Sequence, residues 1–174
     1  MKMDFYISQI CGLVVSLAAI LSMQLKSIKH ILVCQLVCNG IGALSYIMLG
    51  GLSGCGIYLV ALLQTISYSY FRIKEKKAPI WLAMTFIIAY LLCVMATYKG
   101  PTDLISALAA FTCAMGLVQE KASGYRIFML LNGSVWMIYD IAVCAYAMII
   151  SHVATAISAA VGIIRLDIKT KNEK

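Results

Sequence analysis

Seven apolar runs follow one another along the chain, and short polar stretches separate them. A helix needs about 20 residues to cross the hydrocarbon core of a bilayer, and the runs are close to that length. None of them shows the strict alternation of apolar and polar residues that a membrane-spanning strand requires, so the pattern predicts helices. The predicted spans cover residues 5–25, 31–49, 54–71, 80–98, 103–119, 127–143 and 147–165.

The composition supports a membrane protein. Of the 174 residues, 63% are hydrophobic and 12% are charged, and the mean hydropathy is +0.93. Soluble domains are about a quarter charged, and a chain of this size has too small an interior to bury so many apolar side chains. The sequence therefore predicts an all-α, polytopic membrane protein whose first partner is the lipid bilayer.

The net charge of +7 does not indicate a nucleic-acid partner. The charges fall in short clusters between the apolar runs, where they would meet water at a bilayer surface. No basic stripe interleaved with aromatic residues is present to follow a phosphate backbone. The seven cysteines form no CxxC pair and lie in or beside apolar runs, so we expect no metal site and no cofactor.

Lysine and arginine are unevenly distributed between the two sets of connecting loops. Twelve fall in one set, and only Lys2 and Lys99 fall in the other. Cytoplasmic loops are enriched in these residues, so the imbalance predicts an external N-terminus and a cytoplasmic C-terminus. The twelve residues are Lys26, Lys29, Arg72, Lys74, Lys76, Lys77, Lys121, Arg126, Arg165, Lys169, Lys171 and Lys174.

A weak internal repeat divides the chain. A shift of 93 residues superposes Asn39 on Asn132 and Tyr46 on Tyr139, and it also superposes Gly40 on Gly133 and Arg72 on Arg165. We interpret residues 1–78 as one three-helix repeat, residues 79–101 as a linking helix, and residues 102–174 as a second repeat with a basic cytoplasmic tail. A single linking helix makes the two halves parallel, as in several small transporters.

Three short motifs carry a resemblance to a known family. They are Met48-Leu-Gly-Gly-Leu-Ser-Gly54, Trp136-Met-Ile-Tyr139 and Gly162-Ile-Ile-Arg165. With them, the whole chain resembles the YgjV-type bacterial inner membrane proteins. Its 3+1+3 plan is also similar to that of the SWEET, PQ-loop and PnuC transporters. The chain lacks the Pro-Gln pair and the mid-helix proline of the first two groups, which argues against their proline-hinged gating.

Polar side chains form a stripe on the sixth predicted span. At 3.6 residues per turn, Asn132, Trp136, Tyr139 and Asp140 fall within an arc of about 100°. The repeat places Asn39 and Tyr46 on the matching face of the second span. Buried amides and phenols need hydrogen-bond partners, so the two stripes predict a shared polar site. Its candidate substrate-binding residues are Asn39, Tyr46, Gln64, Asn132, Trp136 and Tyr139.

Two ionisable residues are candidates for proton coupling. Asp140 is a carboxylate inside a predicted span, and His152 follows it across a short turn. A membrane-embedded carboxylate can exchange protons and so couple transport to them. The alternatives are that Asp140 faces water at the outer mouth and that His152 is a hydrogen-bonded bystander.

Each substrate-binding candidate also has a structural interpretation. Asn, Gln and Tyr can simply hold neighbouring helices together. Trp136 can instead be an interfacial anchor, as we expect for the aromatic residues at span ends. Those interfacial residues are Tyr68, Tyr70, Trp81, Tyr98 and Tyr125.

The pattern as a whole favours a transporter or facilitator of a small solute. Asn amides beside Trp and Tyr rings suit a small polar or ring-shaped ligand such as a sugar, nucleoside or vitamin. The alternative is a non-transporting scaffold, assembly or sensor protein whose polar residues only join helices. We expect no enzyme, because the sequence contains no HExxH and no GxSxG motif.

Overall fold

The computed structural model describes residues 2–98, 100–142 and 146–168. They form seven α-helices, and the last continues into a short π-helical segment, η1. The bounds agree with the predicted spans except that the sixth helix begins five residues earlier than expected. The helices are α1 Lys2–Gln24, α2 Ile28–Met48, α3 Leu52–Ile73, α4 Ile80–Thr97, α5 Thr102–Val118, α6 Ala122–Ala142 and α7 Tyr146–Gly162, followed by η1 Ile163–Ile168.

Five helical segments within the described residues are long and apolar enough to cross a membrane. They lie in α1, α2, α3, α4 and in α7 continued by η1. Helix α5 is apolar but has only 17 residues. Helix α6 is not among the five, and it carries the polar side chains Arg126, Asn132 and Asp140.

Apolar side chains cover the outside of the bundle, and polar side chains lie within it. Leu17, Leu92 and Ile157 are among the many exposed aliphatic residues, whereas Gln64 and Asp140 are fully buried. This distribution is the reverse of that in a soluble protein, and it suits a bundle whose solvent is lipid.

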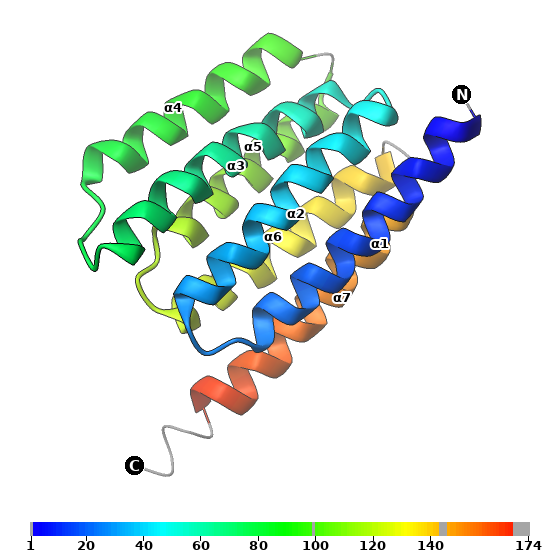
Figure 1. Ribbon diagram of the computed structural model, residues 1–174. Helices are drawn as coiled ribbons and strands as arrows, with labels where there is room; N and C mark the ends of the chain where they lie inside the picture. The colour runs from blue at the N-terminus through cyan, green and yellow to red at the C-terminus, as the bar shows by residue number, and fades with distance from the viewer. Residues whose placement is uncertain (1, 99, 143–145, 169–174) are drawn as a thin grey trace.

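Six helices form a closed ring. Going round the ring, the order is α1, α2, α3, α5, α6, α7 and back to α1, and each helix packs against its two neighbours. Helix α4 lies outside the ring against α3 and α5. Successive helices alternate in direction, so α1, α3, α5 and α7 run one way and α2, α4 and α6 run the other (Figure 1).

The bundle has two ends, which differ in their side chains. We call the end with the α2–α3 and α4–α5 turns the tyrosine end, because Tyr46 lies just inside it. The end with the α1–α2, α3–α4 and α5–α6 turns is the arginine end, because Arg72 and Arg126 lie there. The loop charges predict that the arginine end is cytoplasmic.

The expectation of interfacial aromatic residues was wrong for two of five. Tyr68 and Tyr125 are buried, whereas Tyr70, Trp81 and Tyr98 are exposed. Tyr68 and Tyr125 belong to the helix faces that pack inside the ring. Proximity to the end of a span does not reveal on which face a residue lies.

Candidate functional site

The two polar stripes meet inside the ring, between α2 and α6. The Tyr46 ring stacks on Trp136, with 5.8 Å between ring centroids and 30° between planes. Tyr46 also lies edge-on to Tyr139, at a centroid distance of 6.4 Å. The periodicity of the two predicted spans therefore brings three of the candidate residues into direct contact.

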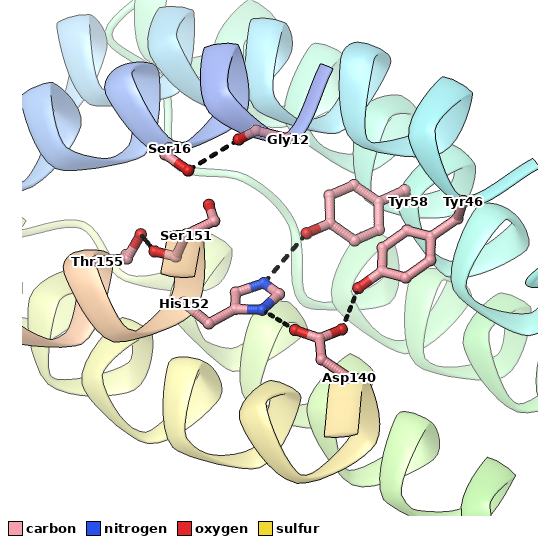
Figure 2. A network of polar contacts seen from close by, with 8 residues as sticks. All are labelled: Gly12, Ser16, Tyr46, Tyr58, Asp140, Ser151, His152 and Thr155. Atoms are coloured by element: carbon pink, nitrogen blue, oxygen red, sulfur yellow. Dashed lines mark hydrogen bonds and ion pairs between the residues drawn. The ribbon is translucent and has the colours of Figure 1, made fainter. Parts of the chain in front are cut away.

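A continuous hydrogen-bonded network links both halves of the chain (Figure 2). The Tyr46 hydroxyl donates to Oδ1 of Asp140 at 2.6 Å, and Nδ1 of His152 lies 2.6 Å from Oδ2 of the same carboxylate. Nε2 of His152 lies 3.3 Å from the hydroxyl of Tyr58. The order Tyr46–Asp140–His152–Tyr58 thus connects α2, α6, α7 and α3.

Burial settles the environment of Asp140 and Trp136. Asp140 is 0% exposed, so it does not face water at the end of the bundle. A buried carboxylate is tolerated only when it is paired and hydrogen-bonded, and His152 and Tyr46 meet both requirements. Trp136 is 3% exposed and stacks on His152 at 5.7 Å with 11° between planes. It is therefore not an interfacial anchor.

Glycines make room for the two tyrosines of the network. A Cβ atom at Gly54 would lie 2.9 Å from the Tyr46 ring, and one at Gly42 would lie 2.2 Å from the Tyr58 ring. Gly50, with φ of +74°, lies four residues after Tyr46, just beyond the end of α2 at Met48, and turns the chain into α3. The Gly-Gly turn of the sequence motif therefore positions Tyr46.

A small cavity lies on the axis of the ring, next to this network. Its volume is about 60 Å³. All six ring helices contribute to its lining and α4 contributes nothing. Among its lining residues are Asn39, Asn132, Trp136 and His152, together with Gln35, Cys38, Tyr58, Cys113, Ser151 and Thr155.

Both candidate asparagines line this cavity and also bond to neighbouring helices. Nδ2 of Asn39 donates to Oγ1 of Thr65 at 3.0 Å. Nδ2 of Asn132 donates to the carbonyl of Ala109 at 2.6 Å and to Oγ1 of Thr112 at 2.9 Å. The two interpretations of these amides, as cavity lining and as links between helices, are therefore compatible.

Gln64 and Tyr139 lie away from the cavity. Gln64 bridges three helices, because its Oε1 accepts from Tyr90 at 2.9 Å and its Nε2 donates to the carbonyl of Ala114 at 3.4 Å. Tyr139 packs against Trp136 and interacts with Asp103, a second buried carboxylate at the tyrosine end.

Two arginines close the opposite end. Arg126 is 1% exposed, donates to the carbonyls of Met23 at 2.9 Å and Leu25 at 2.6 Å, and pairs with Asp167 at 2.7 Å. Arg72 donates to the carbonyls of Val118 at 3.4 Å and Gln119 at 3.0 Å. Each guanidinium therefore satisfies carbonyls at the end of a helix from the other half.

Sequence reasoning did not single out several residues of this site. Tyr58 and Thr65 follow a buried face of α3 with Ala61 and Tyr68, at spacings of three, four and three residues, and this helical period was a usable signal. The burial of Arg126 and Asp103 had no such signal. Each stands at the edge of an apolar run, where a charge normally marks the membrane surface.

Comparison with known proteins identifies the family. A search of curated proteins found no match, and a search of solved structures also found none. The family model Imp-YgjV, described as a bacterial inner membrane protein, matches residues 6–170. With several membrane-crossing helices and this match over nearly its full length, the chain belongs to the YgjV family of bacterial inner membrane proteins.

Proposed function

We propose that the protein carries a small polar solute across the inner membrane along the axis of the helix ring. The observation that carries this proposal is the cavity, because all six ring helices line it and the linking helix does not. A scaffold has no need of a cavity on its axis into which amide side chains project. A transporter with two halves requires a site where the halves meet. The proposal assigns no catalysed reaction.

The packing of the helices supports a 3+1+3 repeat. Exchanging α1, α2 and α3 with α5, α6 and α7 leaves the order of neighbours in the ring unchanged. The alternating helix directions make the two trios parallel (Figure 1). Arg126 and Arg72 bind the carbonyls of Leu25 and Val118, which are separated by the 93 residues of the sequence repeat.

The two ends of the bundle would then act as gates on either side of the cavity. The network of Tyr46, Asp140, His152 and Tyr58 joins the halves at the tyrosine end, which we assign to the outside. The arginine contacts join them at the other end, which we assign to the cytoplasm. Alternating access requires one of these connections to open while the other holds.

Asp140 and His152 supply the proton coupling in this proposal. Their side chains share a short contact of 2.6 Å, and both belong to the second half, whereas Tyr46 and Tyr58 belong to the first. A change in the protons held by the pair alters its bonds to the two tyrosines. Proton movement and opening of the tyrosine end are thereby linked.

The cavity limits the size of the solute. Pockets for drug-sized ligands have about 300–1,000 Å³, whereas a single water requires about 10–15 Å³ of the kind of volume measured here. A cavity of about 60 Å³ fits a solute of a few heavy atoms. A ring-shaped solute, which the aromatic residues of the stripe indicated, would require the bundle to open further.

Uptake into proteoliposomes tests the proposal. The purified protein is reconstituted and screened with small polar solutes, beside Asn132→Ala and the control Ser134→Ala. Ser134 lies on the exposed face of the same helix and, among the described residues, its hydroxyl bonds only to the carbonyl of Leu130. We expect saturable uptake that Asn132→Ala weakens about tenfold and Ser134→Ala retains. Uptake indistinguishable from that of protein-free vesicles for every solute would refute transport.

A non-transporting membrane protein is the second candidate function. The observation that favours it is the Arg126 cluster, because three strong contacts between α6, α1 and η1 resist sliding of these elements. A cross-link between the two trios separates the candidates. A transporter must move its two trios relative to each other, so the cross-link should stop uptake. A scaffold does not need this movement, so the cross-link should not affect its function.

A further inference from the structure

The three amide side chains that line the cavity are all oriented by the same arrangement. Gln35, Asn39 and Asn132 each donate an amide N–H to a hydroxyl on a neighbouring helix. The acceptors are Oγ of Ser22 at 3.3 Å, Oγ1 of Thr65 at 3.0 Å and Oγ1 of Thr112 at 2.9 Å. The residues come from two helices and the hydroxyls from three.

Each hydroxyl can only accept from its amide, because its own proton is already engaged. Ser22 donates to the carbonyl of Ala19 at 2.7 Å, and Thr65 donates to the carbonyl of Ala61 at 2.7 Å. Thr112 donates to the carbonyl of Ala109 at 2.9 Å. The amide group must therefore present its NH₂ to the hydroxyl, which fixes which atom is nitrogen and which is oxygen.

The remaining polar atom of each amide is its carbonyl oxygen. Among the described residues, no donor reaches the side-chain oxygen of Gln35, Asn39 or Asn132. Asn39 and Asn132 are 5% and 8% exposed, so water outside the bundle does not supply a donor freely. The hydroxyl of Ser151, also in the lining, is buried without a partner and can accept as well.

The charges around the cavity favour a positive solute. No lysine, arginine or carboxylate belongs to its lining. The Asp140 carboxylate, which is not in the lining itself, lies 2.6 Å from Nδ1 of the lining residue His152 (Figure 2). A cation or a neutral donor therefore meets favourable oxygens. An anion would meet carbonyl oxygens of the same sign, and the imidazole of His152, the basic side chain of the lining, is already engaged by Asp140.

The lining suits an N–H donor better than a hard metal ion. Ions such as Ca²⁺ take six to eight oxygen ligands, whereas most of this lining is aliphatic or aromatic, including Val15, Ala19 and Ile57. Three amide oxygens and a hydroxyl match the three or four hydrogens of an ammonium group. The volume of about 60 Å³ accommodates such a group with a short alkyl substituent.

We propose that the central cavity selects a small donor-only cation, an ammonium ion or a short primary amine, through the carbonyl oxygens of Gln35, Asn39 and Asn132. This inference rests on the proposed transport function and names its substrate class. Thr65 and Ser22 are positioning residues, because they hold the amides in the orientation that exposes oxygen. Thr112 has the same role for Asn132, shared with the carbonyl of Ala109.

Two measurements on the intact protein test the substrate class. The first is binding of methylammonium to the purified protein in detergent, followed by the shift in thermal unfolding and compared with acetate, glycerol and potassium. The second is uptake of methylammonium by proteoliposomes. We expect stabilisation and saturable uptake with methylammonium alone. Removing one fixed acceptor should weaken binding about tenfold or more, because a hydrogen bond to the charged donor is left unmade.

Thr65→Val is the most informative variant. It preserves the shape of Thr65, removes the hydroxyl that accepts from Asn39, and does not alter the lining. We expect about tenfold weaker methylammonium binding and an unchanged unfolding profile in the absence of solute apart from a small shift. Thr85→Val is the matched control, because exposed Thr85 also donates to a carbonyl four residues back but holds no amide. Binding by this control should equal that of the unchanged protein.

The outcomes separate this inference from the proposed function. Uptake of glycerol or acetate that depends on Asn132, without methylammonium binding, would preserve transport and overturn the substrate class. If potassium competed with methylammonium equally well, this would also overturn the substrate class, because the site would then select by charge alone. Binding of methylammonium with no uptake would support the substrate class and refute the transport function. Equal methylammonium binding by Thr65→Val and the unchanged protein would refute the positioning role and the amide orientation.

Discussion

The two ends of the helix bundle are closed by different chemistry. At the tyrosine end, Tyr46 and Tyr58 of one half bond to Asp140 and His152 of the other. At the arginine end, Arg126 and Arg72 bond mainly to backbone carbonyls across the halves. The first closure contains a carboxylate and an imidazole, two kinds of group that can gain or lose a proton. The second depends on guanidinium groups, which remain charged at any physiological pH.

This difference indicates which end of the bundle can respond to a change in protonation. In the proposed function, a shift of a proton within the network of four side chains releases the tyrosine end. Release of the arginine end would instead have to break the three bonds of Arg126 and the two of Arg72, with no change in the charge of either guanidinium to assist. We therefore expect the tyrosine end to open first and the arginine end to dominate stability.

The largest expected effect tests the arginine end. Arg126→Met keeps the apolar part of the side chain but leaves Asp167 and the carbonyls of Met23 and Leu25 without their donor. Breaking a buried charge pair by removing one partner costs about 3–5 kcal/mol. We expect a loss of this size in the free energy of unfolding, measured by denaturation in detergent.

An exposed ion pair at the same end provides the control. Lys29 pairs with Glu75 at 3.0 Å, and their side chains are 45% and 81% exposed. Exposed pairs contribute about 0–1 kcal/mol, so Lys29→Met should change unfolding by no more than this. If Arg126→Met were as mild as Lys29→Met, the arginine end would not be the stable closure.

The second effect, of intermediate size, tests the tyrosine end. Tyr46→Phe leaves one oxygen of the buried Asp140 carboxylate without its donor, and a hydrogen bond to a charged group is worth about 1.5–3 kcal/mol. Cys38 lines the cavity and reports opening when it is the only cysteine retained. We expect about tenfold faster labelling of Cys38 by an impermeant thiol reagent added outside.

Tyr98→Phe is the matched control for this labelling. Tyr98 is exposed and follows α4 at the same end of the bundle, so its hydroxyl plays no part in the network. In this control, Cys38 should be labelled at the same rate as in the protein that retains Cys38 alone and has no other substitution. Faster labelling by Tyr46→Phe from the cytoplasmic side alone would reverse our assignment of the two ends.

The smallest effect concerns the glycines that surround the network. Gly42→Ala places a methyl group 2.2 Å from the Tyr58 ring, and overpacking of this kind costs about 1–3 kcal/mol. At Gly40, two residues earlier, a Cβ atom meets nothing within 4 Å. Gly40→Ala should instead raise stability by about 0.5–1 kcal/mol through helix propensity. Opposite shifts in the unfolding temperature would confirm the difference, whereas parallel shifts would contradict it.

Much of the fold could be predicted from the sequence because lipid restricts the options. Apolar runs of about 20 residues can only be helices, and their ends agree closely with the observed bounds. The exception is α6, which begins at Ala122, before the predicted residue 127. Arg126 indicated a loop at the membrane surface, but it is buried against the end of α1. A linear pattern does not distinguish a charge in water from one held by carbonyls.

The candidate site was predicted only in part, for a similar reason. Helical period placed Asn132, Trp136 and Asp140 on one face, and the structure brings them to one region of the ring. The helical period of α3 marks Tyr58 and Thr65 as members of a buried face, but it could not show that they lie opposite these residues, because partners depend on the packing of other helices. It also grouped Gln64 with the site, whereas Gln64 bonds towards α4 and α5. The roles of all these residues stay predictions.

The buried guanidinium of Arg126 has a consequence for biogenesis. Helix α6 enters the bilayer with an arginine near one end and an aspartate near the other, and each costs about 2.5–3.5 kcal/mol at the centre of an isolated helix. The carbonyl of Met23, which accepts from Arg126, belongs to α1. The hydroxyl of Tyr46, which donates to Asp140, belongs to α2. We therefore expect α1 and α2 to be in the bilayer before α6 inserts stably, an order that matches the order of synthesis.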